Sequence, residues 1–138
     1  MILFTASVEG FTIMPKVRMT QGSKWSPRAK QYLKSQSDLA MLLKAQYKRK
    51  TPISEPCILS YAVHLPHKRR VDDDNVRKAL QDSLQHAGII LDDYLIRGTD
   101  KTRLYQDGEA RVVVVLKSLE DSSPSAWATA QSASNAGK

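Results

Sequence analysis

Six aspartates and one lysine lie between residues 72 and 93 at spacings that suit metal-ion chemistry: Asp72, Asp73, Asp74, Lys78, Asp82, Asp92 and Asp93. Three of these aspartates are consecutive, and adjacent carboxylates repel one another unless a cation holds them. We expect residues 66–74 to be extended, because Pro66 and a basic run open the segment. Side chains alternate in an extended chain, so Asp72 and Asp74 point to one side and Asp73 to the other. Two carboxylates on one side form an oxygen-rich site for a hard divalent cation.

The rest of this acidic region predicts elements that would complete such a site. A helix is predicted over residues 74–87, with Gly88 as its C-cap, because five apolar residues share one face: Val76, Ala79, Leu80, Leu84 and Ala87. Lys78 lies four residues after Asp74 on the same stripe of this helix, and Asp82 follows four residues later. The pair Asp92–Asp93 comes after a short apolar strand over residues 89–91, so one of them would supply a third carboxylate. Magnesium bound in this way keeps positions for water and a substrate phosphate, which suits phosphodiester hydrolysis.

Plainer interpretations of these residues stay open. The aspartates could be a helix-capping cluster and a turn, and Arg69 and Arg70 could either neutralise them or bind a DNA phosphate. An EF-hand loop is excluded, because Gly and Glu do not stand at the required positions after Asp72. An aspartyl-nucleophile phosphatase is disfavoured, because a basic run rather than a buried apolar strand precedes the aspartates. The three histidines do not converge on one site and are expected to be structural or surface residues: His64, His67 and His86.

The remaining elements indicate an α+β fold: a single domain with a mixed β-sheet and two main α-helices. Strands are predicted over residues 4–8 and 58–65 and over residues 110–116, the last being central, and a hairpin turn over residues 106–109. The first helix begins at Ser26-Pro27 and is predicted to end near Lys50. The domain spans residues 1–117, and the Ser- and Ala-rich residues 118–138 are expected to be a disordered tail.

The distribution of charge points to a polyanionic partner. The chain has a formal net charge of +7, and residues 1–71 hold 13 lysines and arginines against three acids. A basic body with one acidic spot suits nucleic acid together with a local cation site. We predict that DNA contacts Lys16, Arg18, Lys24, Lys68, Arg69 and Arg70. The alternative, which stays open, is that these residues merely face water.

Composition also bears on the compartment. A single cysteine, Cys57, cannot form an internal disulfide or a cysteine zinc cluster, and its apolar neighbours predict that it is buried. The sequence has no apolar run of membrane-spanning length, and its first residues lack the basic segment of a secretory leader. We therefore expect a cytoplasmic protein with no membrane partner.

The block from Arg69 to Ile96 resembles the signature of RusA-type crossover-junction endodeoxyribonucleases, the Holliday-junction resolvases of bacteria and phages. The shared features are a basic run, Asp72-Asp73-Asp74-Asn75, Lys78, a helical aspartate, and an aspartate pair after an apolar strand. The resemblance implies a homodimer that makes paired symmetric cuts in branched DNA during recombination and repair. It further implies that Asp72, Asp74 and Asp93 bind Mg²⁺, with Mn²⁺ as an alternative, and that Lys78 is an essential basic neighbour. The N-terminal segment KVRMTQGSKW departs from the family's Pro/Asn-rich opening, which bears on junction selectivity more than on catalysis.

Three rival functions remain at this point. One is a nuclease of the same fold that acts on other branched or flap DNA, for example in phage DNA processing. Another is a basic DNA-binding module without activity, in which the acids only cap a helix. The third, a metal-dependent phosphohydrolase of small nucleotides, fits the broad positive charge least well.

We predict that residues 118–138 are dispensable for cleavage, because their low-complexity composition sets them apart from the acidic region. Cleavage rates of the truncated and full-length proteins on synthetic junctions would check this. A truncated protein that folds but no longer cuts would contradict it.

Overall fold

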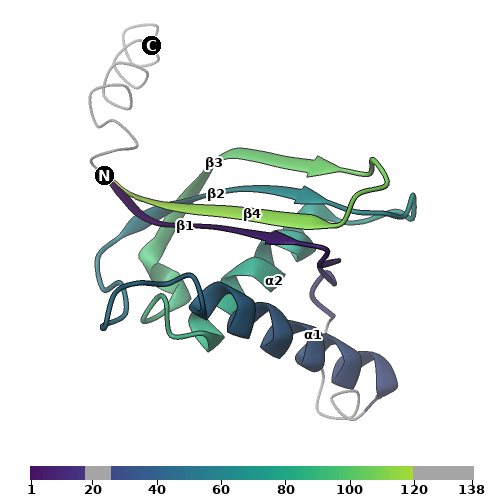
Figure 1. Cartoon of the computed structure of the whole chain (residues 1–138), viewed down its shortest axis with the longest axis horizontal. Coiled ribbons are helices and arrows are strands. Elements are labelled where there is room, and N and C mark those ends of the chain that lie inside the picture. Colours follow the sequence, from purple (N-terminus) through teal and green to yellow (C-terminus); the bar gives the residue numbers. More distant parts are fainter. Residues whose placement is uncertain (18–25, 120–138) are drawn as a thin grey trace, which may run out of the picture.

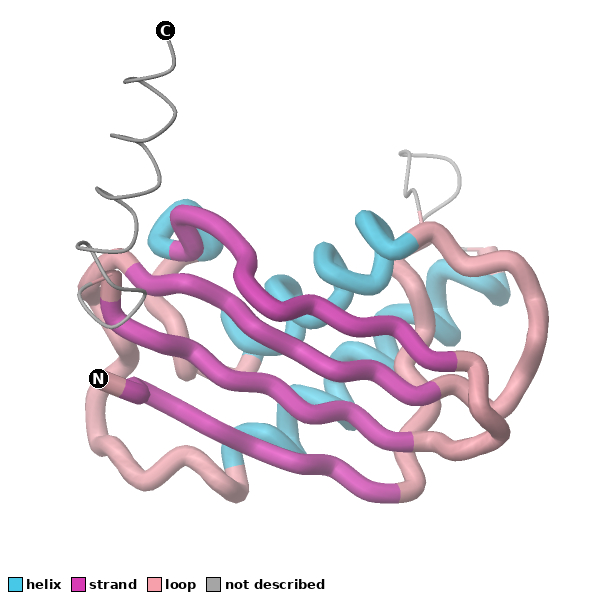
Figure 2. Tube along the Cα trace, turned by 90° about the horizontal axis from the view of Figure 1, so that it is seen from above, coloured by secondary structure: helices cyan, strands magenta, loops and turns pink. Residues whose placement is uncertain are grey.

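Four strands form one mixed sheet, and two helices cover one of its faces (Figures 1 and 2). The computed structural model describes residues 1–17 and 26–119. In chain order its elements are β1 (Ile2–Glu9), α1 (Pro27–Lys44), β2 (Cys57–His64), α2 (Asp73–His86), the 3-10 helix η2 (Asp93–Leu95), β3 (Ile96–Tyr105) and β4 (Arg111–Ser118). The strand order is β1-β4-β2-β3, with β4 antiparallel to both of its neighbours and β2 parallel to β3. The predicted α+β class, the mixed sheet and the central position of the last strand are confirmed.

The start of α1 is set by an N-cap and a proline, and after its end the chain contacts β1. Ser26 is the N-cap, its hydroxyl accepts the Ala29 N–H at 3.1 Å, and proline occupies the first helical position. The helix ends at Lys44 rather than near Lys50. The Gln46 side chain instead pairs with the backbone of Ser7 through bonds of 3.1 and 2.9 Å. The Gln46 side chain thus pairs with the N–H and C=O of Ser7 on the edge strand β1. A helix that continued past Lys44 would leave these two backbone groups unpaired.

The α2 helix begins at Asp73, one residue earlier than predicted, and Asp72 is its N-cap. Residues 73 and 74 are therefore helical, and the predicted extended alternation of the three aspartates is wrong. Capping explains the difference, because an aspartate accepting a backbone N–H two residues ahead initiates a helix even within an acidic run. The expected strand over residues 89–91 is reduced to one bridge between Ile53 and Ile90, and Gly88 ends the helix with a φ of 73°.

The connection from β3 to β4 is not a hairpin, because β2 lies between these two strands. The chain crosses the end of β2 over residues 106–110, where Gly108 has a φ of 84°. The turn residues were identified correctly, but a local pattern does not reveal which strands become neighbours. At the other end of β4, Ser118 is buried, so the strand extends one residue into the predicted tail. Residues 120–138 lie outside the described residues, and a truncation is best made after Leu119.

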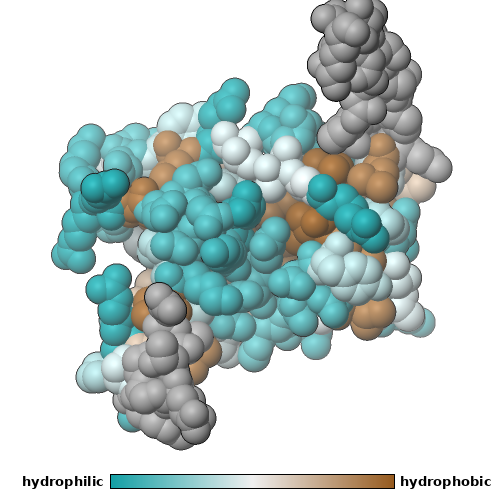
Figure 3. Space-filling model, turned by 180° about the vertical axis from the view of Figure 1, so that it is seen from behind, coloured by the Kyte–Doolittle hydropathy of each residue, from teal (hydrophilic) through white to brown (hydrophobic). Residues whose placement is uncertain are grey.

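The core lies between the sheet and the two helices. Its fully buried members come from every layer and include Tyr32, Leu43, Leu59, Leu80 and Leu116. Cys57 is buried as predicted, and burial, with a smaller effect of Glu55, raises the pKa of its thiol to about 11. On the side opposite that of Figure 1, hydrophilic residues dominate the surface and apolar residues emerge in small patches (Figure 3). Within residues 1–17 and 26–119, neither helix is long and apolar enough to cross a membrane.

Truncation of the central core should destabilise the fold strongly. Leu59 is completely buried on β2, so Leu59→Ala should lower the free energy of unfolding by about 2–5 kcal/mol. Met41, 66% exposed on α1, provides the control, and Met41→Ala should change it by less than about 0.5 kcal/mol. Urea unfolding of both variants would test this packing. Equal losses of stability in the two variants would contradict it.

Candidate active site

The three consecutive aspartates at the start of α2 have three different sets of partners. Asp72 caps the helix, with its Oδ1 accepting the Asp74 N–H at 3.1 Å. Asp73 turns toward the sheet, where its Oδ1 accepts a hydrogen bond of 2.8 Å from the Tyr61 hydroxyl. Asp74 lies on the outer surface of the helix. Asp73 therefore has a different partner from Asp72 and Asp74. A helical turn separates the three side chains, not the alternation of an extended chain that was predicted.

The bond between Tyr61 and Asp73 joins the start of α2 to β2. The Tyr61 side chain is buried, and burial together with the bond and charge of Asp73 raises the pKa of its hydroxyl. The hydroxyl thus stays protonated at neutral pH and donates to the carboxylate. Because Asp72 and Asp74 flank Asp73, this bond also anchors the segment of chain that carries their carboxylates.

Two cations accompany Asp74. Lys78 Nζ lies 3.1 Å from its Oδ2, as the four-residue spacing predicted, and Arg77 pairs with its Oδ1. All three side chains are partly exposed, with 45% of Asp74, 49% of Lys78 and 39% of Arg77 accessible to solvent. A nearby phosphate could therefore reach the same cations that now balance the carboxylate.

A second acidic group lies along α2 and at η2. Asp82 Oδ2 accepts a hydrogen bond of 2.9 Å from the Tyr32 hydroxyl and pairs with Lys16 Nζ at 3.1 Å. Asp92 caps η2, and Asp93 is the first residue of this short helix. The charges of Asp82 and Lys16 both act on Asp93, so these residues belong to one electrostatic group. Lys16, predicted to contact DNA, is thus already paired with a carboxylate.

The pKa of Asp93 is raised above its ordinary value of 3.8. The largest cause is a hydrogen bond with the Asp92 carboxyl, followed by partial desolvation and the negative charges of Asp92 and Asp82, while Lys16 acts in the opposite direction. Two facing carboxyls hold a shared proton more readily than two separate ones. This loop thus carries negative charge that the folded chain only partly compensates.

In the described residues, the ligand atoms of Asp72, Asp74 and Asp93 do not all lie within 4.8 Å of one another. In the described parts of the chain, one group brings three ligand atoms within 4.8 Å of one another, and it contains none of Asp72, Asp74 and Asp93. Asp72 and Asp74 lie at the start of α2. Asp93 lies near Asp82 and Lys16, and the Lys16 backbone N–H donates to the Asn75 carbonyl at the start of α2 at 2.9 Å. Hard carboxylate oxygens suitable for Mg²⁺ are therefore present at both places.

The basic segment before the aspartates is held by a loop far away in sequence. Gln106 Nε2 donates to the carbonyls of Arg69 at 2.6 Å and His67 at 3.2 Å, and Lys68 Nζ donates to the carbonyl of Gln106 at 2.8 Å. The side chains of Arg69 and Arg70 are exposed and form no ion pair among the residues that the structure describes. They are not paired with the adjacent aspartates, and the cations that pair with Asp74 are Arg77 and Lys78. Arg18 and Lys24, also predicted to contact DNA, lie outside the described residues.

A comparison with protein families identifies the family of this chain. A family model described as endodeoxyribonuclease RusA matches residues 12–117, a span that includes both acidic groups and the basic segment. The chain belongs to the RusA family. The resemblance inferred from the sequence is thereby confirmed, and the family is one of endodeoxyribonucleases. A comparison with curated proteins finds no match.

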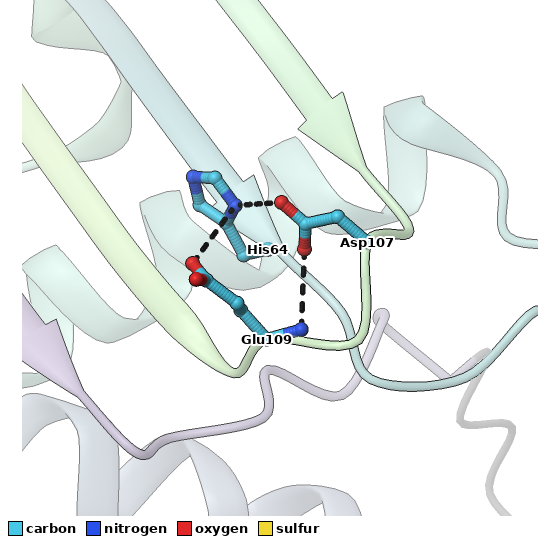
Figure 4. Close-up of side chains that lie close together, drawn as sticks. All are labelled: His64, Asp107 and Glu109. Atoms are coloured by element: carbon cyan, nitrogen blue, oxygen red, sulfur yellow. Dashed lines mark hydrogen bonds and ion pairs between the residues drawn. The ribbon is translucent and has the colours of Figure 1, made fainter.

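One cluster of charged and polar side chains in this RusA-family chain was not predicted from the sequence. At the end of β2, His64 faces Asp107 and Glu109 from the β3–β4 connection, at 2.7 Å and 3.9 Å from its Nδ1 (Figure 4). Arg111 Nη2 lies 3.1 Å from the other ring nitrogen, Nε2. A guanidinium can only donate, so Nε2 accepts, and Nδ1 carries the proton that His64 donates to Asp107. Tyr105 stacks on the imidazole at a centroid distance of 4.6 Å.

This cluster fastens the connection that carries Gln106. The hydrogen bond from His64 is the main reason why the pKa of Asp107 is lowered. A separation of 2.7 Å between Nδ1 and Oδ2 is that of a hydrogen bond. Against the expectation that the histidines lack ligand-like convergence, His64, Asp107 and Glu109 form the group whose ligand atoms lie within 4.8 Å of one another. The 43-residue separation of His64 from Asp107 hid this pairing in the sequence.

The raised pKa of Asp93 predicts a stabilising substitution. A carboxyl whose pKa is higher in the folded state makes the free energy of unfolding fall as pH rises through the window above 3.8. Asp93→Asn removes this effect and should raise Tm at pH 7, modestly because the side chain is exposed, and the difference should vanish below pH 3.8. Calorimetry at several pH values would show it. A Tm at pH 7 below that of the parent protein would contradict this origin of the shift.

Proposed function

We propose that this RusA-family protein resolves Holliday junctions by paired symmetric cleavage, as a magnesium-dependent, cytoplasmic homodimer in recombination and repair. The observation that carries the proposal is the exposed pair Asp72 and Asp74 beside Lys78 at the start of α2. It supplies hard ligands for a cation and a basic group within reach of the same carboxylate. Its position directly after the exposed side chains of Arg69 and Arg70 suits a site that a DNA phosphate must enter.

The Asp72–Asp74 pair would hold the cation, and Asp93 would complete its carboxylate set. Bound Mg²⁺ would activate water and stabilise the leaving oxygen in phosphodiester hydrolysis. The hydrogen bond between Tyr61 and Asp73 would hold the segment that carries the two carboxylates before substrate arrives. Lys78, now paired with Asp74, would shift its contact toward the incoming phosphate.

In the described chain the ligand atoms of Asp93 and the Asp72–Asp74 pair do not all lie within 4.8 Å of one another, and a second subunit would supply the third carboxylate. We propose that Asp93 of one subunit reaches the Asp72–Asp74 pair of the other. A two-fold symmetric dimer would then contain two equivalent sites, one for each strand to be cut. Each site would form only on dimerisation. Cleavage would then occur only in the dimer, which is the form that can make paired cuts.

The exposed side chains of Lys68, Arg69 and Arg70 would bind the DNA backbone leading into the site. Their position depends on the bonds of Gln106, so the basic segment is presented in one conformation rather than ordered by the DNA. Contacts of this kind release counterions, so junction affinity should fall steeply with salt.

Mixing two inactive variants tests the shared site. Asp74→Asn and Asp93→Asn should each lower junction cleavage by orders of magnitude without unfolding the protein, because each removes a metal ligand. After subunit exchange, a heterodimer of the two has both defects in one site and leaves the other intact, so cleavage should partly return. The matched control, Asp72→Asn mixed with Asp74→Asn, damages the same pair in both subunits and should stay inactive.

The outcomes separate the alternatives. No recovery in the first mixture, with each variant inactive alone, would place all ligands in one subunit. Activity that survives every substitution, or that does not need Mg²⁺, would refute the catalytic assignment and favour a DNA-binding module. Comparing four-way junctions with flaps and duplexes would decide between junction resolution and cleavage of other branched DNA.

A further inference from the structure

A cavity of about 660 Å³ lies next to the candidate active site. Its walls come from residues 12–15, from the first turns of α1 and from residues 67–71. The volume is within the range of about 300–1,000 Å³ that binds small ligands. Val71 lines the cavity and Asp72 follows it directly, so the cavity and the proposed metal ligands share one segment of chain.

Three unpaired arginines line this cavity. Arg28 comes from the first turn of α1, and Arg69 and Arg70 come from the basic segment. Among the described residues none of the three has a carboxylate within ion-pair distance, in contrast to Arg77 and Arg111. No acidic side chain of the described segments lines the cavity. Arginines that line one cavity without a counter-charge favour an anion, and the planar guanidinium matches a phosphate through two hydrogen bonds.

The other lining residues are suited to a flat, partly apolar group. Ile13 is buried, and Met14 and Val71 are partly buried beside it. His67 also lines the cavity, and its Nδ1 is buried without a hydrogen-bond partner in the described structure. A buried polar atom without a partner costs stability unless a ligand or water satisfies it. A DNA base has apolar faces for such walls, and its entry would bring a polar edge close to the His67 ring that borders the cavity.

We infer that this cavity binds one nucleotide of the DNA substrate, unstacked from its strand, beside the bond to be cut. The arginines would hold its phosphate, and the base would lie against Ile13, Met14 and Val71. The inference rests on the proposed function and adds a reason for substrate selectivity. Unstacking a base costs least where the duplex is already interrupted, so the cavity favours branch points over continuous duplex.

The test uses junctions that carry 2-aminopurine, a base whose fluorescence rises when it leaves the stack, at each position flanking the cleaved bond. The full-length protein is bound to them without divalent metal, so that the DNA stays uncut. We expect a several-fold rise in fluorescence at one position. Filling the cavity with Ser35→Trp, from a half-buried wall residue on α1, should abolish the rise and slow cleavage. Met41→Trp is the control, because Met41 lies on the same helix, is 66% exposed and does not line the cavity.

Should Ser35→Trp fail to fold, Gln31→Trp fills the cavity from an exposed position on the same wall. Junction binding and cleavage without any fluorescence rise would overturn the nucleotide site and leave the proposed function standing. A rise that persists in a folded, filled variant would place the unstacked base elsewhere and would also overturn it. Failure of the parent protein to bind junctions would instead refute the proposed function, and the inference with it.

Discussion

The hydrogen bond between the buried Tyr61 hydroxyl and Asp73 ties the acidic end of α2 to the middle of the sheet. Three consecutive carboxylates repel one another, and the helix resolves this by giving each a separate direction and partner. Asp72 binds the helix backbone, Asp73 binds the sheet, and Asp74 faces two cations on the surface. The arrangement of the candidate site depends on this division, because a shift of the helix start by one residue would move every carboxylate.

The sequence was most informative where chemistry and periodicity agree locally. The Ser26-Pro27 start of α1, the helical stripe linking Asp74 to Lys78, and the buried valine-rich strand all follow from spacings of a few residues. The precise start of α2 was missed, because Asp72, Asp73 and Asp74 are all good N-caps and only the partner of each carboxylate decides among them. That partner for Asp73, Tyr61, lies 12 residues away on a strand.

Contacts between residues far apart in the sequence could not be predicted from local spacing either. The residues 106–109 have the composition of a hairpin turn, yet the strands they join are separated by β2. The contacts of Gln106 with the basic segment and of His64 with Asp107 span 37 to 43 residues. The position of Asp93 relative to Asp72 and Asp74 is likewise a property of the folded chain, since sequence spacing alone does not decide whether the three carboxylates meet.

The edge position of β3 affects how copies of this protein meet. An open edge strand invites pairing with the same strand of another molecule. β3 resists this: its ladder with β2 is interrupted by register shifts, Lys101 adopts a φ of 54°, and charged side chains recur along it. A continuous sheet running through two molecules is therefore disfavoured along this edge. A concentrated preparation is protected there from strand-mediated aggregation, and the parallel β2–β3 pair can remain at the rim of the sheet without a covering element.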